Sequence, residues 1–155
     1  MHTYFKDKVI IITGASSGIG LATARLFAGM GAKLSLAARS IDRLESLASE
    51  LTDDRSRILC IKTDVSVEED CRRLIEETVR RFGKIDILIN NAGISQSAPI
   101  LDYKPGDFEM AMSINVTALF HTIQPVVAIM KEQGGGVIIN TSSMVSFTGQ
   151  PSGVG

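Results

Sequence analysis

The chain has 155 residues, of which 45% are hydrophobic, and it carries a formal net charge of −1. This length suits one α/β domain with a real core, residues 1–155, and is too short for two. The hydrophobic content excludes a disordered chain, and the near-neutral charge gives no electrostatic case for a nucleic-acid partner. We also expect no membrane partner, because no apolar run approaches the ~20 residues of a spanning helix.

Cysteine and histidine usage favours a reducing compartment and no bound metal. Cys60 falls in an apolar, strand-like run and Cys71 in a helix-like one, which is typical of reduced thiols. His2 and His121 are isolated in the sequence, so we expect no metal site. The first apolar run begins already at Val9, which leaves no room for a signal peptide and predicts a cytoplasmic protein.

Strand-like and helix-like segments alternate along the chain. Apolar runs predict five strands, at residues 9–13, 33–38, 58–63, 85–90 and 137–141. Helical patterns lie between them, at residues 18–30, 41–52, 67–82 and 106–133. Repeated strand–helix–strand units with right-handed crossovers predict an α/β fold, in which a parallel sheet is covered by helices on both faces.

Capping and helix-breaking residues predict where two of these helices begin and end. Ser66, followed three residues later by Glu69, predicts a capping box at the start of the third helix. Pro105 suits the first turn of the fourth helix, and Pro125 should kink or divide it. The three glycines at 134–136 should end the fourth helix.

A glycine-rich octet, TGASSGIG at residues 13–20, joins the first predicted strand to the first helix. At such a turn, exposed N–H groups and the positive end of the helix dipole can hold a pyrophosphate. Glycines there allow a tight turn, close approach of backbone to phosphate, and close packing of the helix on the strand. An ordinary turn of some other α/β protein is the alternative. The candidate cofactor-binding residues are Gly14, Ser16, Ser17, Gly18, Ile19 and Gly20.

The end of the second predicted strand bears on which dinucleotide binds. An acidic residue there marks NAD, whereas a nearby arginine accommodates the 2′-phosphate of NADP. This chain has Ala38 at the strand end, followed by Arg39. The pair therefore favours NADP(H), with NAD(H) possible, because a planar guanidinium suits a phosphate. The alternative interpretation of Arg39 is a solvated surface residue.

The octet and three later segments together resemble the short-chain dehydrogenase/reductase family, over all 155 residues. The segments are Asp64-Val65 after the third strand, NNAG at 90–93 after the fourth, and Thr141-Ser142-Ser143 after the fifth. The resemblance implies a Rossmann-type, doubly wound sheet of strand order 3-2-1-4-5, here truncated after the fifth strand. It also implies a nicotinamide cofactor, a small carbonyl or alcohol substrate, and assembly into dimers or tetramers.

The resemblance further implies roles for single residues in cofactor binding. Asp64 would accept a hydrogen bond from the adenine amino group, and the backbone at Val65 would help to hold the ring. Asn91, Ala92 and Gly93 would lie close to the cofactor and tie strand ends together. One departure bears on the cofactor, because many NADP-preferring members carry a basic residue where this chain has Ser17. A helix-capping role for Asp64 and a plain turn at the NNAG segment are the alternatives.

Two candidate catalytic residues also follow from the resemblance. The hydroxyl of Ser143, the last residue of its serine run, would hydrogen-bond the substrate carbonyl oxygen. Asn115 would hold a water of the proton relay, although asparagine is also common as an exposed helix residue. The motif G-x-S-x-G is absent, which argues against a hydrolase.

The family's proton donor is a tyrosine in a Y-x-x-x-K motif, which the resemblance places just beyond Gly155. Tyr4 and Tyr103 are the only tyrosines, and neither belongs to such a motif. We therefore expect the 155-residue chain alone to be inactive and its fifth strand to be an uncovered sheet edge. Two interpretations stay open. The chain is part of a longer oxidoreductase, which we favour, or it is a catalytically silent dinucleotide-binding module that is complete at 155 residues.

Overall fold

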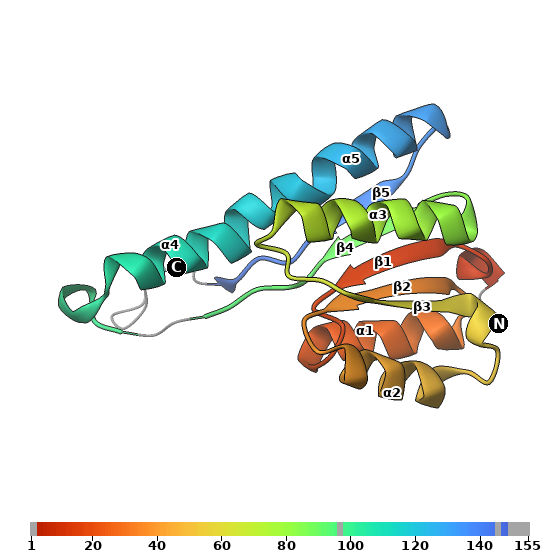
Figure 1. The fold of residues 1–155 in the computed structure, drawn as a ribbon, viewed down its shortest axis with the longest axis horizontal. Coiled ribbons are helices and arrows are strands. Elements are labelled where there is room, and N and C mark those ends of the chain that lie inside the picture. Colours follow the sequence, from red (N-terminus) through yellow and green to blue (C-terminus); the bar gives the residue numbers. More distant parts are fainter. Residues whose placement is uncertain (1–2, 96–97, 145–146, 149–155) are drawn as a thin grey trace.

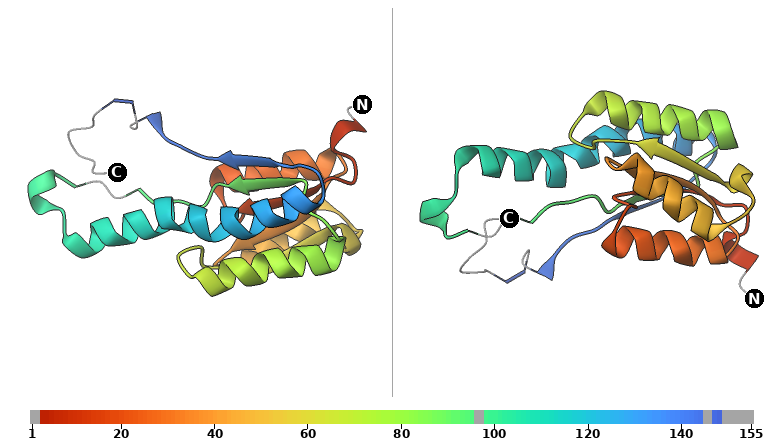
Figure 2. Two further views of the ribbon diagram at one scale, coloured as in Figure 1. Left: turned by 90° about the horizontal axis from the view of Figure 1, so that it is seen from above. Right: turned by 60° about the horizontal axis from the view of Figure 1, so that its bottom comes forward.

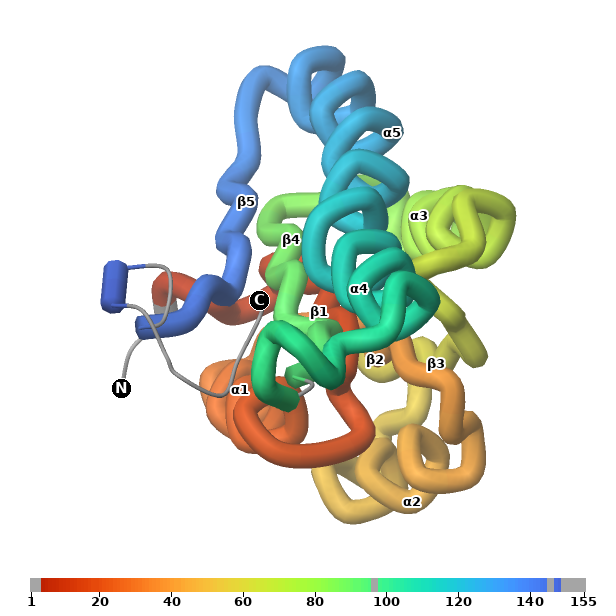
Figure 3. Tube along the Cα trace, turned by 90° about the vertical axis from the view of Figure 1, so that its left-hand side faces the viewer, coloured from red at the N-terminus to blue at the C-terminus, as the bar shows by residue number. Residues whose placement is uncertain are grey.

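The computed structural model describes residues 3–95, 98–144 and 147–148, in which five parallel strands form one sheet (Figure 1). The strands are β1 (Val9–Thr13), β2 (Lys33–Ala38), β3 (Ile58–Lys62), β4 (Ile87–Asn90) and β5 (Val137–Asn140). Their order is β3-β2-β1-β4-β5, which Figure 3 shows from the side on which α4 lies. The observed order confirms the predicted Rossmann-type sheet.

Two pairs of long helices cover the two faces of this sheet (Figures 1 and 2). On one face lie α1 (Gly18–Gly29) and α2 (Ile41–Leu51), and on the other lie α3 (Glu68–Phe82) and α5 (Ala118–Glu132). A shorter helix, α4 (Pro105–Met112), leads into α5 and projects past the sheet (Figure 1). Short 3₁₀ turns lie at η1 (Thr3–Phe5), η2 (Arg55–Arg57) and η3 (Ile100–Asp102).

The sheet is buried between two apolar clusters because its side chains alternate between faces. In β1, Ile10 and Ile12 join the cluster under α1 and α2, whereas Ile11 joins the cluster under α3 and α5. All five residues of β1 are buried. Strand β1 therefore lies at the centre of the sheet, and its carboxyl end, where the glycine loop begins, is held from both faces.

The predicted strands agree with the observed ones at β1 and β2, and the other three end or begin differently. Strands β3 and β5 stop one residue earlier than predicted, and β4 begins at Ile87 rather than at residue 85. The backbone of Ile85 instead bonds the side chain of Gln133, whose Oε1 accepts from its N–H at 3.3 Å. A distant side chain thus replaces the first part of the predicted strand.

The predicted capping box at Ser66 and Glu69 is wrong. Helix α3 begins at Glu68, and its N-cap is Val67, which makes no side-chain capping bond. The hydroxyl of Ser66 donates backwards instead, to Oδ1 of Asp64 at 2.6 Å. Asp64 competes successfully for this hydroxyl because its carboxylate is a charged acceptor that also takes the Ser66 N–H.

The predicted helix at 106–133 is divided, but at Ser113–Thr117 rather than at Pro125. These five residues form a π-helical turn, η4, between α4 and α5. Helix α5 passes through Pro125 without ending, so the prediction of a division there is wrong. The helix begins at Pro105 as predicted, and Gly134, with a φ of +88°, follows its end.

Two apolar surfaces remain uncovered within the described residues. Strand β5 is an edge strand, and Val137 and Ile139 are 51% and 47% exposed.

The combined helix Pro105–Glu132 is long and apolar enough to cross a membrane by length and composition alone. The expectation that no segment has this length and composition is therefore wrong, although core helices of soluble proteins pass the same test.

Candidate functional site

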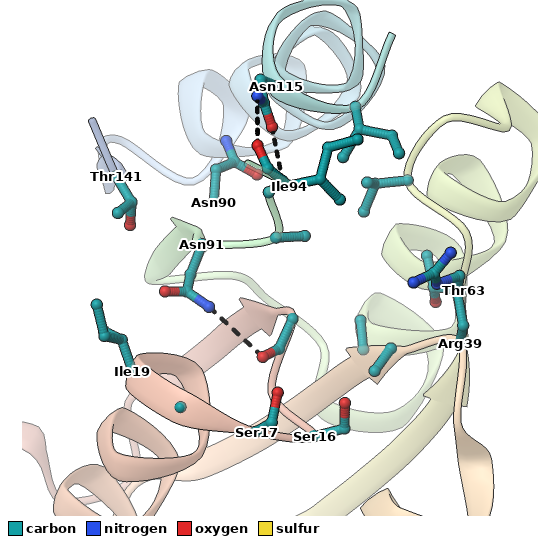
Figure 4. A pocket seen from close by; sticks show the side chains of 18 of the residues that line it. Ser16, Ser17, Ile19, Arg39, Thr63, Asn90, Asn91, Ile94, Asn115 and Thr141 are labelled. Carbon is teal, nitrogen blue, oxygen red and sulfur yellow. Dashed lines mark hydrogen bonds between the residues drawn. The ribbon is translucent and has the colours of Figure 1, made fainter. Parts of the chain in front are cut away.

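A cavity of about 770 Å³ opens at the carboxyl ends of the strands, where the glycine loop, the ends of β2 to β5 and the start of α5 meet. Figure 4 shows Arg39 and Thr63 at one side of it and Thr141 at the other. In an open α/β sheet, this edge is where ligands bind. All the predicted site residues except Gly20 line the cavity, namely Gly14, Ser16, Ser17, Gly18, Ile19, Arg39, Asp64, Val65, Asn91, Ala92, Gly93, Asn115 and Ser143.

The glycine loop has the backbone shape of an anion cradle. Gly14 and Gly18 have φ values of +66° and +54°, a region that other residues enter only at a cost. A Cβ on Gly18 would meet no atom within 4 Å among the described residues, so the backbone there is open to a ligand. The Ser17 side chain makes no capping bond, which leaves first-turn N–H groups of α1 available to an anion.

Gly20 contributes packing rather than cavity lining. A Cβ at this position would lie 2.4 Å from the backbone oxygen of Gly14 and 2.6 Å from Nδ2 of Asn91. Neither atom can move far, because both belong to the glycine loop and the segment bonded to it. Gly20 thus lets α1 lie directly against the start of its own loop.

The hydroxyl of Thr13 joins the glycine loop to the NNAG segment. It accepts hydrogen bonds from the N–H groups of Asn91 and Ala92, both at 3.0 Å. In return, Nδ2 of Asn91 donates to the backbone oxygen of Thr13 at 3.1 Å. It also lies 3.5 Å from the backbone oxygen of Gly14, the contact that Figure 4 marks with a dashed line. These bonds hold the ends of β1 and β4 at one fixed spacing.

The carboxylate of Asp64 lies at the β3 side of the cavity. Its Oδ1 accepts from both the N–H and the hydroxyl of Ser66, at 3.0 and 2.6 Å. The hydrogen bond from the Ser66 hydroxyl is the largest influence on Asp64 and lowers its pKa. Partial burial raises the pKa, and the Ser66 N–H and the charge of Arg39 lower it further. The net result is a pKa below 3.8. Asp64 therefore stays ionised at neutral pH and remains a hydrogen-bond acceptor.

The β2 end of the cavity is cationic. Arg39, Ser40 and Arg43 all line it, and all three are exposed. The sequence interpretation used Arg39 and missed Arg43, which lies in the first turn of α2. The spacing of four residues between Arg39 and Arg43 could have indicated that both lie on one side of a helix. That rule applies only when both residues are helical, and Arg39 precedes α2.

Asn115 lies within the π-helical turn and binds the chain after the NNAG segment. Its Oδ1 accepts from the N–H of Ile94 and its Nδ2 donates to the oxygen of Ile94, both at 2.9 Å (Figure 4). In a π-helical turn, backbone hydrogen bonds join residues five apart instead of four, and such turns are frequent at functional sites. The Asn115 side chain is therefore engaged with the main chain.

A buried polar network holds the end of β5, which carries Ser143. Oδ1 of Asn90 accepts from the hydroxyl of Thr122 on α5, and Nδ2 of Asn90 donates to Oδ1 of Asn140, both at 2.9 Å. Asn90 and Thr122 are both buried, so the bond between them is shielded from water, whereas Asn140 is exposed. The network fixes where Thr141–Ser143 leave the sheet.

Further residues line the cavity that were not among the predicted site residues, although Ala38, Asn90, Thr141 and Ser142 belong to segments noted in the sequence. Most of them are small or apolar, and their types match ordinary core residues, so no local signal separates them. They are Ala37, Ala38, Ser40, Arg43, Thr63, Asn90, Ile94, Ser95, Ile114, Leu119, Thr141 and Ser142.

In the described part of the chain, no group of three or more His, Cys, Asp or Glu is placed to hold a metal ion. His2 lies outside that part. Cys60 and Cys71 are free thiols, and burial raises the pKa of each to about 12. Neither thiol is therefore a nucleophile at neutral pH.

The fold and the cavity together define a dinucleotide-binding protein of the α/β class. The family model described as short chain dehydrogenase matches residues 8–155, so the chain belongs to this family of oxidoreductases. It is 42% identical, over all of its length, to a 3alpha-hydroxysteroid dehydrogenase of Mediterraneibacter gnavus, of which it covers 63%. It is 41% identical to an uncharacterised oxidoreductase of Listeria monocytogenes, with 96% of the chain and 60% of that protein covered.

Solved structures give the same family. An NAD⁺-bound xylitol dehydrogenase superimposes with a TM-score of 0.90 at 37% identity, covering 96% of this chain and 58% of that one. A 3-ketoacyl-(acyl-carrier-protein) reductase of Brucella melitensis, complexed with NADH, gives 0.89 at 32% identity, with 96% and 62% covered. The chain thus spans about three-fifths of the length of these proteins.

Proposed function

We propose that the whole protein is an NADP(H)-dependent oxidoreductase, which transfers hydride between a nicotinamide and the carbonyl or alcohol group of a small molecule. The observation that carries this proposal is that Arg39, the glycine loop and Ser143 all line one cavity. One end of it is cationic, the middle offers backbone N–H groups, and the other end carries hydroxyl side chains. The first two features suit the 2′-phosphate and the pyrophosphate of NADP(H). The hydroxyl groups at the other end can hold the carbonyl oxygen of a substrate.

The residues at the cationic end support NADP(H) over NAD(H). Ala38 presents no carboxylate to a 2′-phosphate, while Arg39 and Arg43 offer two guanidinium groups that pair well with phosphate. NAD(H) is the alternative, because the two structural neighbours described above were solved with NAD⁺ and NADH. Ser17 adds no positive charge that would strengthen the preference.

The nicotinamide, when bound, supplies the hydride chemistry. This chain supplies Ser143, whose hydroxyl would donate to the substrate carbonyl oxygen and stabilise the charge that develops there. Asn115 would support the proton relay through its backbone, because both ends of its side-chain amide hold Ile94. The proton donor is expected in a Y-x-x-x-K motif beyond these residues, and the 155-residue chain alone should be inactive.

The test is a set of titrations and assays on the whole protein. NADP⁺ should bind more tightly than NAD⁺, and NADPH should be oxidised in the presence of an acceptable carbonyl compound. Ser143→Ala should lower kcat by roughly 10²–10³-fold, the usual cost of one oxyanion donor. Tight cofactor binding without turnover on any carbonyl or alcohol would instead support a catalytically silent binding module.

We further propose a cytoplasmic homo-oligomer, either a dimer or a tetramer. The exposed apolar side chains of the helix Pro105–Glu132, among them Phe108, Phe120 and Val127, support burial against another chain. Sedimentation of the whole protein should give two or four copies. Flotation with lipid vesicles, rather than a defined oligomer, would point to a membrane surface as the partner.

A further inference from the structure

His121 is a half-buried side chain of α5 that the proposed function does not use. Its Nδ1 lies 3.3 Å from the backbone oxygen of Val65, in the loop after β3. Since a carbonyl oxygen can only accept, Nδ1 must carry the proton in this contact. His121 therefore donates from the helix on one side of the cavity to a loop that lines it.

The peptide that His121 contacts is held at its other end by Asp64. The oxygen of Val65 and the N–H of Ser66 belong to one planar peptide group. Its oxygen accepts from His121, and its N–H donates to Oδ1 of Asp64 at 3.0 Å. The orientation of this single peptide thus links the imidazole of His121 to the carboxylate of Asp64.

Two further hydrogen bonds to this loop involve side chains of α3. The N–H of Asp64 donates to Oδ2 of Asp70 at 2.8 Å, and Sγ of Cys71 donates to the Val65 oxygen at 3.4 Å. A thiol is a weak donor, so His121 is the stronger partner of this oxygen. With Oδ1 of Asp64 occupied twice by Ser66, Oδ2 is the oxygen that an adenine amino group would meet.

We propose that His121 is a positioning residue for the adenine end of the dinucleotide site. By holding the Val65–Ser66 peptide, it keeps the Asp64 carboxylate turned into the cavity. It touches neither substrate nor cofactor. The inference rests on the proposed function, because it needs an adenine nucleotide in the cavity.

Two substitutions in the whole protein separate the hydrogen bond from the bulk of the side chain. His121→Leu removes the donor and keeps much of the volume, whereas His121→Asn keeps an N–H close to the place of Nδ1. Glu132→Gln, at an exposed position at the end of the same helix, is the control. The probe is adenosine 2′,5′-diphosphate, with its dissociation constant measured by calorimetry, together with KM for NADPH and kcat.

His121→Leu should weaken binding of adenosine 2′,5′-diphosphate and raise KM for NADPH by about three- to tenfold, with kcat within about twofold. His121→Asn should restore most of the affinity, and Glu132→Gln should match the wild type. Unchanged affinity in His121→Leu would overturn the inference while leaving the proposed function intact. Equal losses in His121→Leu and His121→Asn, with lowered Tm, would also overturn it. Failure of the wild-type protein to bind the probe and NADPH would overturn both.

Discussion

The side-chain amide of Asn115 makes two hydrogen bonds to the backbone of Ile94. It accepts one from the Ile94 N–H and donates one to the Ile94 oxygen, each at 2.9 Å. The contact joins the π-helical turn to the chain that follows the NNAG segment. It therefore ties two parts of the site together that are 21 residues apart in the sequence.

Asn115→Ala should lower the free energy of unfolding by about 1–3 kcal/mol, because it leaves two backbone groups of Ile94 without this partner. Urea denaturation measures the change. Val116→Ala, at the exposed neighbouring position, is the control and should stay within about 0.5 kcal/mol. Equal effects of the two substitutions would show that the Asn115 contact adds nothing to stability.

Gly20→Ala should be strongly destabilising, because its Cβ would lie 2.4 Å from the Gly14 oxygen. We expect a loss of about 2–4 kcal/mol and weaker binding of both dinucleotides, since the glycine loop must move. Gly29→Ala is the matched change at the end of the same helix, where a Cβ meets nothing within 4 Å among the described residues. It should be neutral or stabilising by up to about 1 kcal/mol. A tolerated Gly20→Ala would refute the packing role.

Arg39→Ala should weaken NADP(H) binding by about 1–3 kcal/mol, or roughly 5- to 150-fold, because a charge-assisted contact to the 2′-phosphate is lost. Binding of NAD(H), which lacks this phosphate, should be unchanged. Fluorescence titration with both reduced cofactors measures the two affinities. Arg25→Ala, which breaks an exposed ion pair with Glu50 outside the cavity, serves as the control. Equal affinity of the unmodified protein for both cofactors would disprove the preference.

Asp86→Asn should remove a pH-dependent part of the stability. Partial burial raises the pKa of Asp86, but Lys84, the Val9 N–H and Lys8 together lower it below 3.8. Because the folded pKa lies below the ordinary value, the stabilisation is complete above about pH 4 and is lost as pH falls through the folded pKa.

The asparagine variant should thus be less stable at pH 7, by about 1 kcal/mol, with the difference shrinking below pH 4. Chemical denaturation at pH 7 and pH 3 gives both values. The exposed Asp53 provides the control substitution, Asp53→Asn. A difference that grows toward low pH would contradict the sign of the shift.

A polypeptide of residues 1–155 alone should self-associate or fold only partly, because β5 is an apolar edge strand. Ile139→Lys places a charge on this edge and should reduce association. Sedimentation velocity and near-UV circular dichroism check size and packing. A monodisperse, cooperatively melting monomer without the lysine would rule the prediction out.

The central strands and the glycine loop could be predicted from the residues, and the strand order from the family resemblance. Strands β1 and β2 match their predicted bounds because each is an apolar run buried on both faces, and burial of that kind is visible residue by residue. Gly14 and Gly18 could be placed as loop residues because a positive φ is a local demand that glycine meets.

The long-range partners of polar side chains could not be predicted in this way. Gln133 binds the backbone of Ile85, and the helix divides where Asn115 binds Ile94 rather than at Pro125. The pairings of Gln133 and Asn115 span 48 and 21 residues, and that of His121 with Val65 spans 56. A hydrogen bond depends on distance and direction in space, and for residues so far apart only the packed fold determines either one.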